Sequence, residues 1–188
     1  MTPPEQALRG AIDAAALRVA QSKAMTLVEA LPWLQRFRGA LVVIKYGGNA
    51  MVDDELKAAF AQDIVFLRYA GLRPVVVHGG GREIDRALFA AGIAKQQIDG
   101  LRITDDATLH VVVSVLGGTI NTQFVAALNA AKVKAVGLTG ADASVAPVKK
   151  AAPHTASSGA TVSLGQVGEP AGRTTPHLLL HLTKGGYV

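Results

Sequence analysis

The segment LVVIKYGGNAM, residues 41–51, joins a short apolar run to a lysine and two consecutive glycines. The residues from Leu41 to Ile44 are bulky or β-branched, which favours a strand covered on both faces, as in a parallel sheet. Gly47 and Gly48 carry no side chain to keep a ligand away from backbone N–H groups, so a phosphate could lie there with Lys45 as counter-charge. A tight strand-to-helix turn beside a solvated lysine explains these residues equally well.

The segment RPVVVHGGGREID, residues 73–85, repeats the arrangement of a buried strand followed by glycines. An amphipathic helix is expected between the two strands, with Leu56, Phe60 and Ile64 on its apolar face, and another helix is expected over residues 82–91. This alternation predicts an α/β fold with a parallel sheet. Because ligands bind at the carboxyl ends of parallel strands, both glycine turns are expected at one binding edge.

Four further segments complete the expected fold. A long helix is expected around residues 116–128; Gly117 and Gly118 interrupt it, which indicates close approach of a second helix. The sequence KAVGLTGADAS, residues 134–144, predicts a third buried strand that leads to another glycine turn. Residues 151–175 are typical of hairpins or loops, and residues 176–188 predict a helix and the beginning of a strand.

Apolar residues at helical spacing precede the first strand and predict an N-terminal helical arm. They begin at Leu8 and Ile12 and continue to Phe37, with Pro32 expected to bend or restart the helix. The expected organisation is therefore an arm over residues 1–38 and one α/β domain over residues 39–188.

Composition narrows the class of protein. The chain has 188 residues, of which 49% are hydrophobic, enough for one domain with a real core. Its net charge of +5 fits an anionic ligand, but an aromatic content of 5% leaves few stacking platforms for nucleic acid. The lack of cysteine excludes disulfides and thiolate metal sites. No signal peptide or stretch near the ~20 apolar residues of a membrane span is recognised, so a soluble cytoplasmic protein is expected.

Common nucleotide motifs are incomplete or missing. Ile84 occupies the third glycine position of a dinucleotide fingerprint, and no Walker loop occurs. His78 could act as a base, although a local role in shaping the turn is favoured. Arg102 could clamp a carboxylate or be a solvated surface arginine. No set of residues has convincing metal-ligand spacing.

Together these motifs resemble, in order and over most of the chain, the N-terminal part of the acetylglutamate kinases of the amino-acid kinase family. The matching segments are EALPWLQRF, VVIKYGGNAM, VVVHGGG, GLRITD, AVGLTGADA, GQVGE and GGYV. The resemblance implies a three-layer αβα sandwich with a mainly parallel central sheet, preceded by the helical arm.

The resemblance also assigns roles to residues. Lys45 would be catalytic and stabilise the phosphoryl group in transfer, and Gly47 and Gly48 would approach the nucleotide phosphates. The acetylglutamate-binding residues would be Gly80, Gly81 and Arg102, with Arg102 binding a substrate carboxylate.

The implied reaction transfers the γ-phosphoryl group of ATP to the side-chain carboxylate of N-acetyl-L-glutamate, in arginine biosynthesis. Mg²⁺ would accompany ATP without a dedicated protein cage, since this ion commonly binds through phosphates and water. The arm and the N-terminal domain would form a homodimer or higher homo-oligomer. No nucleic acid or membrane partner is implied.

The sequence departs from the family in several places. The family continues beyond GGYV into an N-x-N-A-D segment and a nucleotide domain with a second lysine, which these 188 residues lack. Arg82 replaces a usual proline, and Pro170 replaces a valine. The alternatives are a non-catalytic N-acetylglutamate or amino-acid sensor and, disfavoured by the broken fingerprint, a Rossmann-type oxidoreductase.

Overall fold

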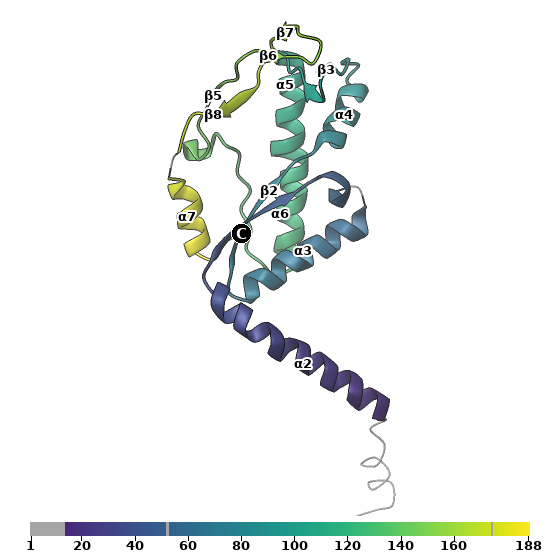
Figure 1. Ribbon diagram of the computed structural model, residues 1–188, viewed down its shortest axis with the longest axis vertical. Helices are drawn as coiled ribbons and strands as arrows, with labels where there is room; N and C mark the ends of the chain where they lie inside the picture. The colour runs from purple at the N-terminus through teal and green to yellow at the C-terminus, as the bar shows by residue number, and fades with distance from the viewer. Residues whose placement is uncertain (1–13, 52, 174) are drawn as a thin grey trace, which may run out of the picture. The chain divides into compact units, whose positions relative to one another are not determined.

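The structure is a computed structural model that describes residues 14–51, 53–173 and 175–188. Its contacts divide the chain into two compact units, Met1–Ala40 and Leu41–Val188. The first unit contains helix α2 (Ala14–Phe37), which passes through Pro32 without restarting (Figure 1). The predicted helix is therefore present from Ala14 onward, and its expected first residues, Leu8 and Ile12, lie outside the described part.

The second unit alternates strands and helices as the sequence predicts. Its elements are β1 (Leu41–Tyr46), η1 (Gly48–Met51), α3 (Asp54–Tyr69), β2 (Arg73–His78), α4 (Gly81–Ala90), β3 (Gln97–Ile98), β4 (Leu101–Arg102), α5 (Asp106–Val113), η2 (Ser114–Ile120), α6 (Asn121–Ala130), η3 (Asp142–Ser144), β5 (Val148–Lys150), β6 (His154–Thr155), β7 (Thr161–Val162), β8 (Gly168–Pro170) and α7 (His177–Lys184). Three strand pairs are antiparallel: the β3–β4 hairpin, the β6–β7 hairpin, which lies within the residues 151–175 expected to form hairpins or loops, and the pair β5–β8.

A parallel pair of strands forms the centre of this unit. β1 and β2 pair along their full length, from Leu41 opposite Arg73 to Tyr46 opposite His78, and α3 connects them (Figure 1). Ile44 and Val76 pack against a core to which α3 and α6 contribute. The predicted α/β class with a parallel sheet is confirmed.

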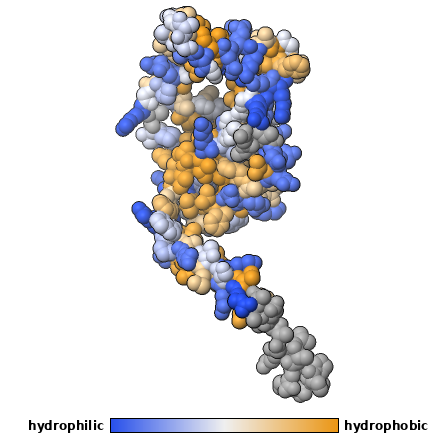
Figure 2. All heavy atoms as spheres, turned by 45° about the vertical axis from the view of Figure 1, so that its right-hand side comes forward, coloured by the Kyte–Doolittle hydropathy of each residue, from blue (hydrophilic) through white to orange (hydrophobic). Residues whose placement is uncertain are grey.

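The opposite face of the two strands is less covered than the sequence predicts. Val43 is 64% exposed and Val77 is 53% exposed. Apolar side chains also reach the surface elsewhere in the unit, as the orange areas of Figure 2 show. The prediction that the strand from Leu41 to Ile44 is covered on both faces is therefore wrong for this face, because side chains alternate along a strand and the helices named above cover one side.

The third strand predicted at the start of residues 134–144 does not form as a regular strand, whereas a turn at Gly140 and Ala141 follows as predicted. The first residues of this segment pair with the last residue of the chain: Val136 N–H donates to Val188 O and Val188 N–H donates to Lys134 O, both at 2.9 Å. A strand needs a ladder of several such bonds on a neighbour, and a single residue supplies two.

The long helix is observed as α5, η2 and α6 in succession, with η2 a π-helical segment. A Cβ on Gly117 would lie 3.3 Å from Thr139 Cγ2, whereas one on Gly118 would meet open space. The close neighbour of Gly117 is therefore the segment around Thr139, and not the second helix that was expected.

By length and mean hydropathy alone, this Asp106–Ala130 helix could cross a membrane, which the sequence analysis did not anticipate. Core helices of soluble proteins share these properties. In this unit α5 packs against α4, and α6 packs against α3. Only 17% of its most apolar window is buried by these contacts within the described part of the chain.

Leu128 and Leu56 form a matched pair for testing the core. Leu128 is 2% exposed and Leu56 is 51% exposed. We expect Leu128→Ala to lower the free energy of unfolding by about 2–5 kcal/mol, because it leaves a cavity, and Leu56→Ala to lower it by less than about 1 kcal/mol. Urea titration followed by circular dichroism measures both, and equal losses would contradict this core.

Candidate functional site

The two glycine turns lie side by side at one end of the β1–β2 pair. Tyr46 and His78 are in register, and Gly79 N–H donates to Tyr46 O at 2.9 Å. A Cβ on Gly47 would lie 3.9 Å from Gly79 N. The sequence prediction that both turns meet at one edge of the sheet is therefore confirmed.

Tyr46 fixes this edge to the core. Its ring stacks on Phe60 with centroids 4.0 Å apart and on Phe124 with centroids 5.4 Å apart. Burial raises the pKa of the Tyr46 hydroxyl, although the positive charge of Lys57 opposes that rise and Glu83 adds to it. The phenol is therefore neutral at physiological pH, and the turn that follows it has an apolar anchor.

Lys45, unlike the buried Tyr46, lies on the exposed face of β1. It precedes Tyr46, so its side chain projects to the exposed face of β1. Within the described part of the chain, no hydrogen bond or ion pair involves the Lys45 ammonium group. This cation is therefore available to an anionic ligand, and its catalytic role stays a prediction.

The glycines of the two turns are required for different reasons. Gly48 has a φ of +65°, which favours glycine. A Cβ on Gly80 would lie 2.3 Å from Ile120 Cδ1 and 2.9 Å from Leu116 Cδ2, whereas a Cβ on Gly81 would meet nothing within 4 Å. Gly80 is therefore needed for packing against η2, a role that sequence reasoning missed. Contact of Gly80 and Gly81 with a substrate stays a prediction.

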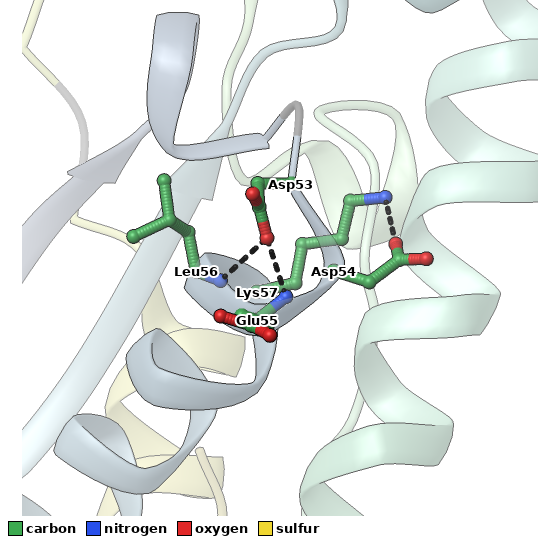
Figure 3. A network of polar contacts seen from close by, with 5 residues as sticks. All are labelled: Asp53, Asp54, Glu55, Leu56 and Lys57. Atoms are coloured by element: carbon green, nitrogen blue, oxygen red, sulfur yellow. Dashed lines mark hydrogen bonds and ion pairs between the residues drawn. The ribbon is translucent and has the colours of Figure 1, made fainter.

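The helices that follow the two turns begin differently. Asp53 caps α3, because its Oδ1 accepts hydrogen bonds from the N–H groups of Glu55 at 2.7 Å and Leu56 at 3.4 Å (Figure 3). Beside it, Lys57 Nζ lies 2.8 Å from Asp54 Oδ1, and this hydrogen bond lowers the pKa of Asp54. The first residue of α4 is Gly81, and no side chain caps that helix. Its terminal N–H groups thus lack the side-chain acceptor that α3 has, and they lie beside the HGGG turn.

His78 acts locally. Its Nδ1 lies 3.1 Å from the carbonyl oxygen of Gly79. This contact agrees with the favoured interpretation that the histidine shapes the turn.

Arg102 is not a solvated surface residue. It lies in β4, and its side chain is 17% exposed. Its Nη2 donates to Asp85 Oδ1 at 2.5 Å, while the other oxygen of Asp85 accepts from Lys95 Nζ at 2.7 Å. Nη1 of Arg102 is buried and has no hydrogen-bond partner within the described part of the chain. The structure therefore attaches Arg102 to α4, the helix that begins at the HGGG turn.

Asp85 and Lys95 were missed by the sequence analysis. The pKa of Asp85 is lowered: burial alone would raise it, but the hydrogen bonds from Lys95 and Arg102 outweigh burial. The carboxylate is thus ionised at neutral pH. Its contact with Arg102 spans 17 positions, and no local pattern in the sequence marks such a pair.

A second carboxylate holds the turn of the β3–β4 hairpin. Asp99 and Gly100 form this turn with φ values of +48° and +79°. Asp99 accepts hydrogen bonds from Ser157 Oγ at 2.7 Å and Ser157 N at 2.9 Å, and it lies 2.9 Å from His154 Nε2. The β6–β7 hairpin thereby holds the hairpin that carries Arg102, a contact that sequence reasoning also missed.

The GQVGE segment supports the residues that follow Arg102. Gln166 N–H donates to Thr104 O, and Thr104 N–H donates to Leu164 O. A Cβ on Gly165 would lie 2.2 Å from Thr104 O, so only glycine permits this approach. The departure Pro170 lies at the end of β8 opposite Val148, and the next residue, Ala171, still donates its N–H to Pro147 O at 3.0 Å. The other departure, Arg82, is exposed on α4.

Metal ligands do not cluster in the described residues. Residues 14–51, 53–173 and 175–188 contain no group of three or more His, Cys, Asp or Glu side chains that could hold an ion.

Comparison with known proteins gives the class. The model of the amino acid kinase family matches residues 40–181, a range that includes both glycine turns, Lys45 and Arg102. The chain therefore belongs to the amino acid kinase family.

Two relatives within this family are both acetylglutamate kinases. The chain is 47% identical over 173 residues to an acetylglutamate kinase of Saccharopolyspora erythraea, covering 92% of this chain and 56% of that relative. It is 52% identical over 147 residues to an acetylglutamate kinase of Streptomyces coelicolor, covering 78% and 47% respectively. The chain thus spans about half the length of the curated relatives that it matches.

A solved structure shares the fold. The N-acetylglutamate synthase of Neisseria gonorrhoeae, complexed with coenzyme A and N-acetyl-glutamate, superposes with a TM-score of 0.67 at 25% identity. The match covers 88% of this chain and 36% of that chain.

Gly80 and Gly81 offer adjacent positions with opposite expectations for stability. We expect Gly80→Ala to lower the free energy of unfolding by about 1–3 kcal/mol, because its methyl group overlaps Ile120 and Leu116. We expect Gly81→Ala to leave it unchanged or raise it by up to about 1 kcal/mol, since alanine favours a helix. Chemical denaturation measures both; a tolerated Gly80→Ala would contradict the packing role.

The Asp99 contacts predict a dependence of stability on pH. The hydrogen bonds from Ser157 and His154 lower the pKa of Asp99 from 3.8 to about 2. Their contribution is therefore present above about pH 4 and is lost as the pH falls toward 2. We expect Asp99→Asn to destabilise the fold at pH 7 and to cost less at pH 2–3, measured by denaturant titration at each pH. Asp63→Asn, which removes an exposed carboxylate of α3, controls for the loss of one charge, and a pH-independent difference for Asp99→Asn would refute the interpretation.

Proposed function

We propose that this chain binds N-acetyl-L-glutamate and ATP and supports transfer of the γ-phosphoryl group to the side-chain carboxylate. The observation that carries the proposal is the register of β1 and β2, which sets Lys45, the KYGG turn and the HGGG turn at one sheet edge. The names of the relatives in S. erythraea and S. coelicolor support the choice of reaction.

The chemistry requires neutralisation of charge. An oxygen of the substrate carboxylate attacks the γ-phosphorus, the bond from that phosphorus to the β,γ-bridging oxygen breaks, and the products are an acyl phosphate and ADP. Both reactants are anions, so alignment and stabilisation of negative charge dominate the barrier. Lys45, with no partner in the described chain, would stabilise the phosphoryl group, and the backbone at Gly47 and Gly48 would approach the nucleotide phosphates.

The substrate end would be built on α4 and β4. Gly80 and Gly81 would bring backbone N–H groups to acetylglutamate, and Arg102 would bind one of its carboxylates. The buried, unpartnered Nη1 of Arg102 supports this role, because an unsatisfied donor is costly unless a ligand pairs with it.

ATP would arrive with Mg²⁺ bound to its phosphates, where the ion neutralises charge. The chain's own contribution would be the lysine and the glycine turns. The family supports ATP as the phosphoryl donor.

The wider organisation is also proposed. Residues 1–38 would be an arm, and residues 39–188 would be the acetylglutamate-binding and dimerisation domain of a cytoplasmic homo-oligomer in arginine biosynthesis. Exposed apolar side chains on α2, among them Leu27 and Val28, support a role of the arm in association. Light scattering at high concentration tests this part, and a strict monomer would contradict it.

A non-catalytic binding or sensor function is the second candidate. The orphaned Nη1 favours it, because that atom indicates binding of an acceptor without indicating chemistry. The two functions differ in what Lys45 contributes.

The test measures ADP release and ligand binding with the purified chain. If the chain is a kinase, we expect acetylglutamate to stimulate ADP release, and Lys45→Ala to abolish that stimulation while leaving acetylglutamate affinity nearly unchanged. Arg102→Ala should weaken acetylglutamate binding by about tenfold or more under either function, through loss of a charge-assisted contact.

Two exposed residues provide controls of the same type. Lys150→Ala in β5 and Arg86→Ala in α4 remove one positive charge each. Neither should alter turnover or binding by more than about twofold. Binding without turnover in the folded wild type would identify the sensor function, and unchanged affinity in Arg102→Ala would refute the substrate assignment.

A further inference from the structure

The ion-pair cluster around Asp85 has a geometry that the proposed roles do not use. Asp85 lies on α4, one helical turn after Gly81, and each of its oxygens contacts a different cation, Arg102 Nη2 or Lys95 Nζ. The side chains of Asp85 and Lys95 are 35% and 39% exposed, whereas that of Arg102 is 17% exposed. Asp85 therefore connects α4, the helix that begins at the HGGG turn, to Arg102, which is less exposed than Lys95.

The two terminal nitrogens of the Arg102 guanidinium group differ in their contacts. Nη2 is occupied by Asp85, and Nη1 is buried without a partner in the described chain. A guanidinium group is planar and rigid, so fixing one nitrogen fixes the direction in which the others point. Asp85 thereby determines where Nη1 can donate.

The net charge of the Asp85, Lys95 and Arg102 cluster affects how strongly it attracts an anion. Arg102 with Asp85 alone would be a neutral pair, which attracts an anion weakly. Lys95 contacts the second oxygen of Asp85 and returns the three-residue set to a net charge of +1. The cluster thus combines a fixed guanidinium group with one surplus positive charge.

We propose that Asp85 is a positioning residue that holds Arg102 so that Nη1 meets a carboxylate of the substrate, and that Lys95 preserves the positive charge this contact needs. The inference rests on the proposed function, since it assigns the ligand of Arg102 to acetylglutamate.

For Asp85→Asn, a purely electrostatic role of Asp85 and a positioning role predict opposite changes in acetylglutamate affinity, so this variant distinguishes the two roles. Asp85→Asn raises the net charge of the cluster from +1 to +2, so a purely Coulombic role, or competition of Asp85 with the substrate for Arg102, predicts tighter binding of acetylglutamate. Positioning predicts weaker binding despite the added charge.

The experiment is calorimetric titration of the purified chain with N-acetyl-L-glutamate and, separately, with ATP. We expect Asp85→Asn to weaken acetylglutamate binding about tenfold, the size of one lost charge-assisted hydrogen bond, with ATP affinity unchanged. Asp85→Glu should restore part of the affinity. Lys95→Gln should weaken binding about threefold, as for an exposed ion pair.

Glu169→Gln and Lys149→Gln are the matched controls. They remove the partners of the Lys149–Glu169 ion pair between β5 and β8, at 3.7 Å. They should leave both affinities unchanged. Unchanged or tighter acetylglutamate binding in Asp85→Asn would overturn the positioning role.

A second measurement separates this inference from the proposed function. The Nε–Hε resonance of Arg102 in the unliganded chain should report an ordered guanidinium group in wild type and a mobile one in Asp85→Asn. An ordered group in a wild type that binds no acetylglutamate would overturn the proposed function while supporting Asp85 as the residue that orients Arg102. A guanidinium group equally ordered in both proteins would overturn the inference, even if Asp85→Asn has too little stability for titration.

Discussion

The parallel pairing of β1 with β2 is the constraint on which the rest of the larger unit depends. Its register places Tyr46 opposite His78, and the chain can then turn at Gly47 and Gly79 side by side. Tyr46 stacks on Phe60 and so keeps this edge fixed to the core, while Lys45, one residue earlier, projects to the other face. A shift of one residue would exchange these environments and bury the lysine.

In the HGGG turn, two neighbouring glycines have different roles: one is needed for packing and the other leaves the backbone accessible. Gly80 leaves no room for a side chain beside Ile120 and Leu116, so it fixes the distance between the turn and η2. Gly81, the next residue, faces open space and begins α4 without a side-chain cap. One glycine therefore serves the fold, and the other leaves backbone donors accessible.

Arg102 illustrates the cost of placing a cation where water has little access. A buried guanidinium group needs acceptors, and Asp85 provides one for Nη2 but none for Nη1. The β3–β4 hairpin that carries Arg102 is in turn held by Asp99 contacts to the β6–β7 hairpin. Two carboxylates from different parts of the chain thus contact Arg102 or the hairpin that carries it, and in the proposed function they would preorganise this arginine for its ligand.

The sequence by itself determined the elements and the turns. Apolar runs followed by glycines predicted β1, β2 and their turns at one edge, because those patterns depend on neighbours within a few residues. The short motifs KYGG and GLRITD, which are local patterns of the same kind, indicated Lys45 and Arg102 through the resemblance to the family. Tertiary structure alone decided what Arg102 contacts, why Gly80 is a glycine, that Val43 is exposed, and that residues 134–144 form no regular strand. Each of these depends on atoms brought together from distant positions, such as Asp85 with Arg102 or Val136 with Val188, and local residue preferences carry no information about such contacts.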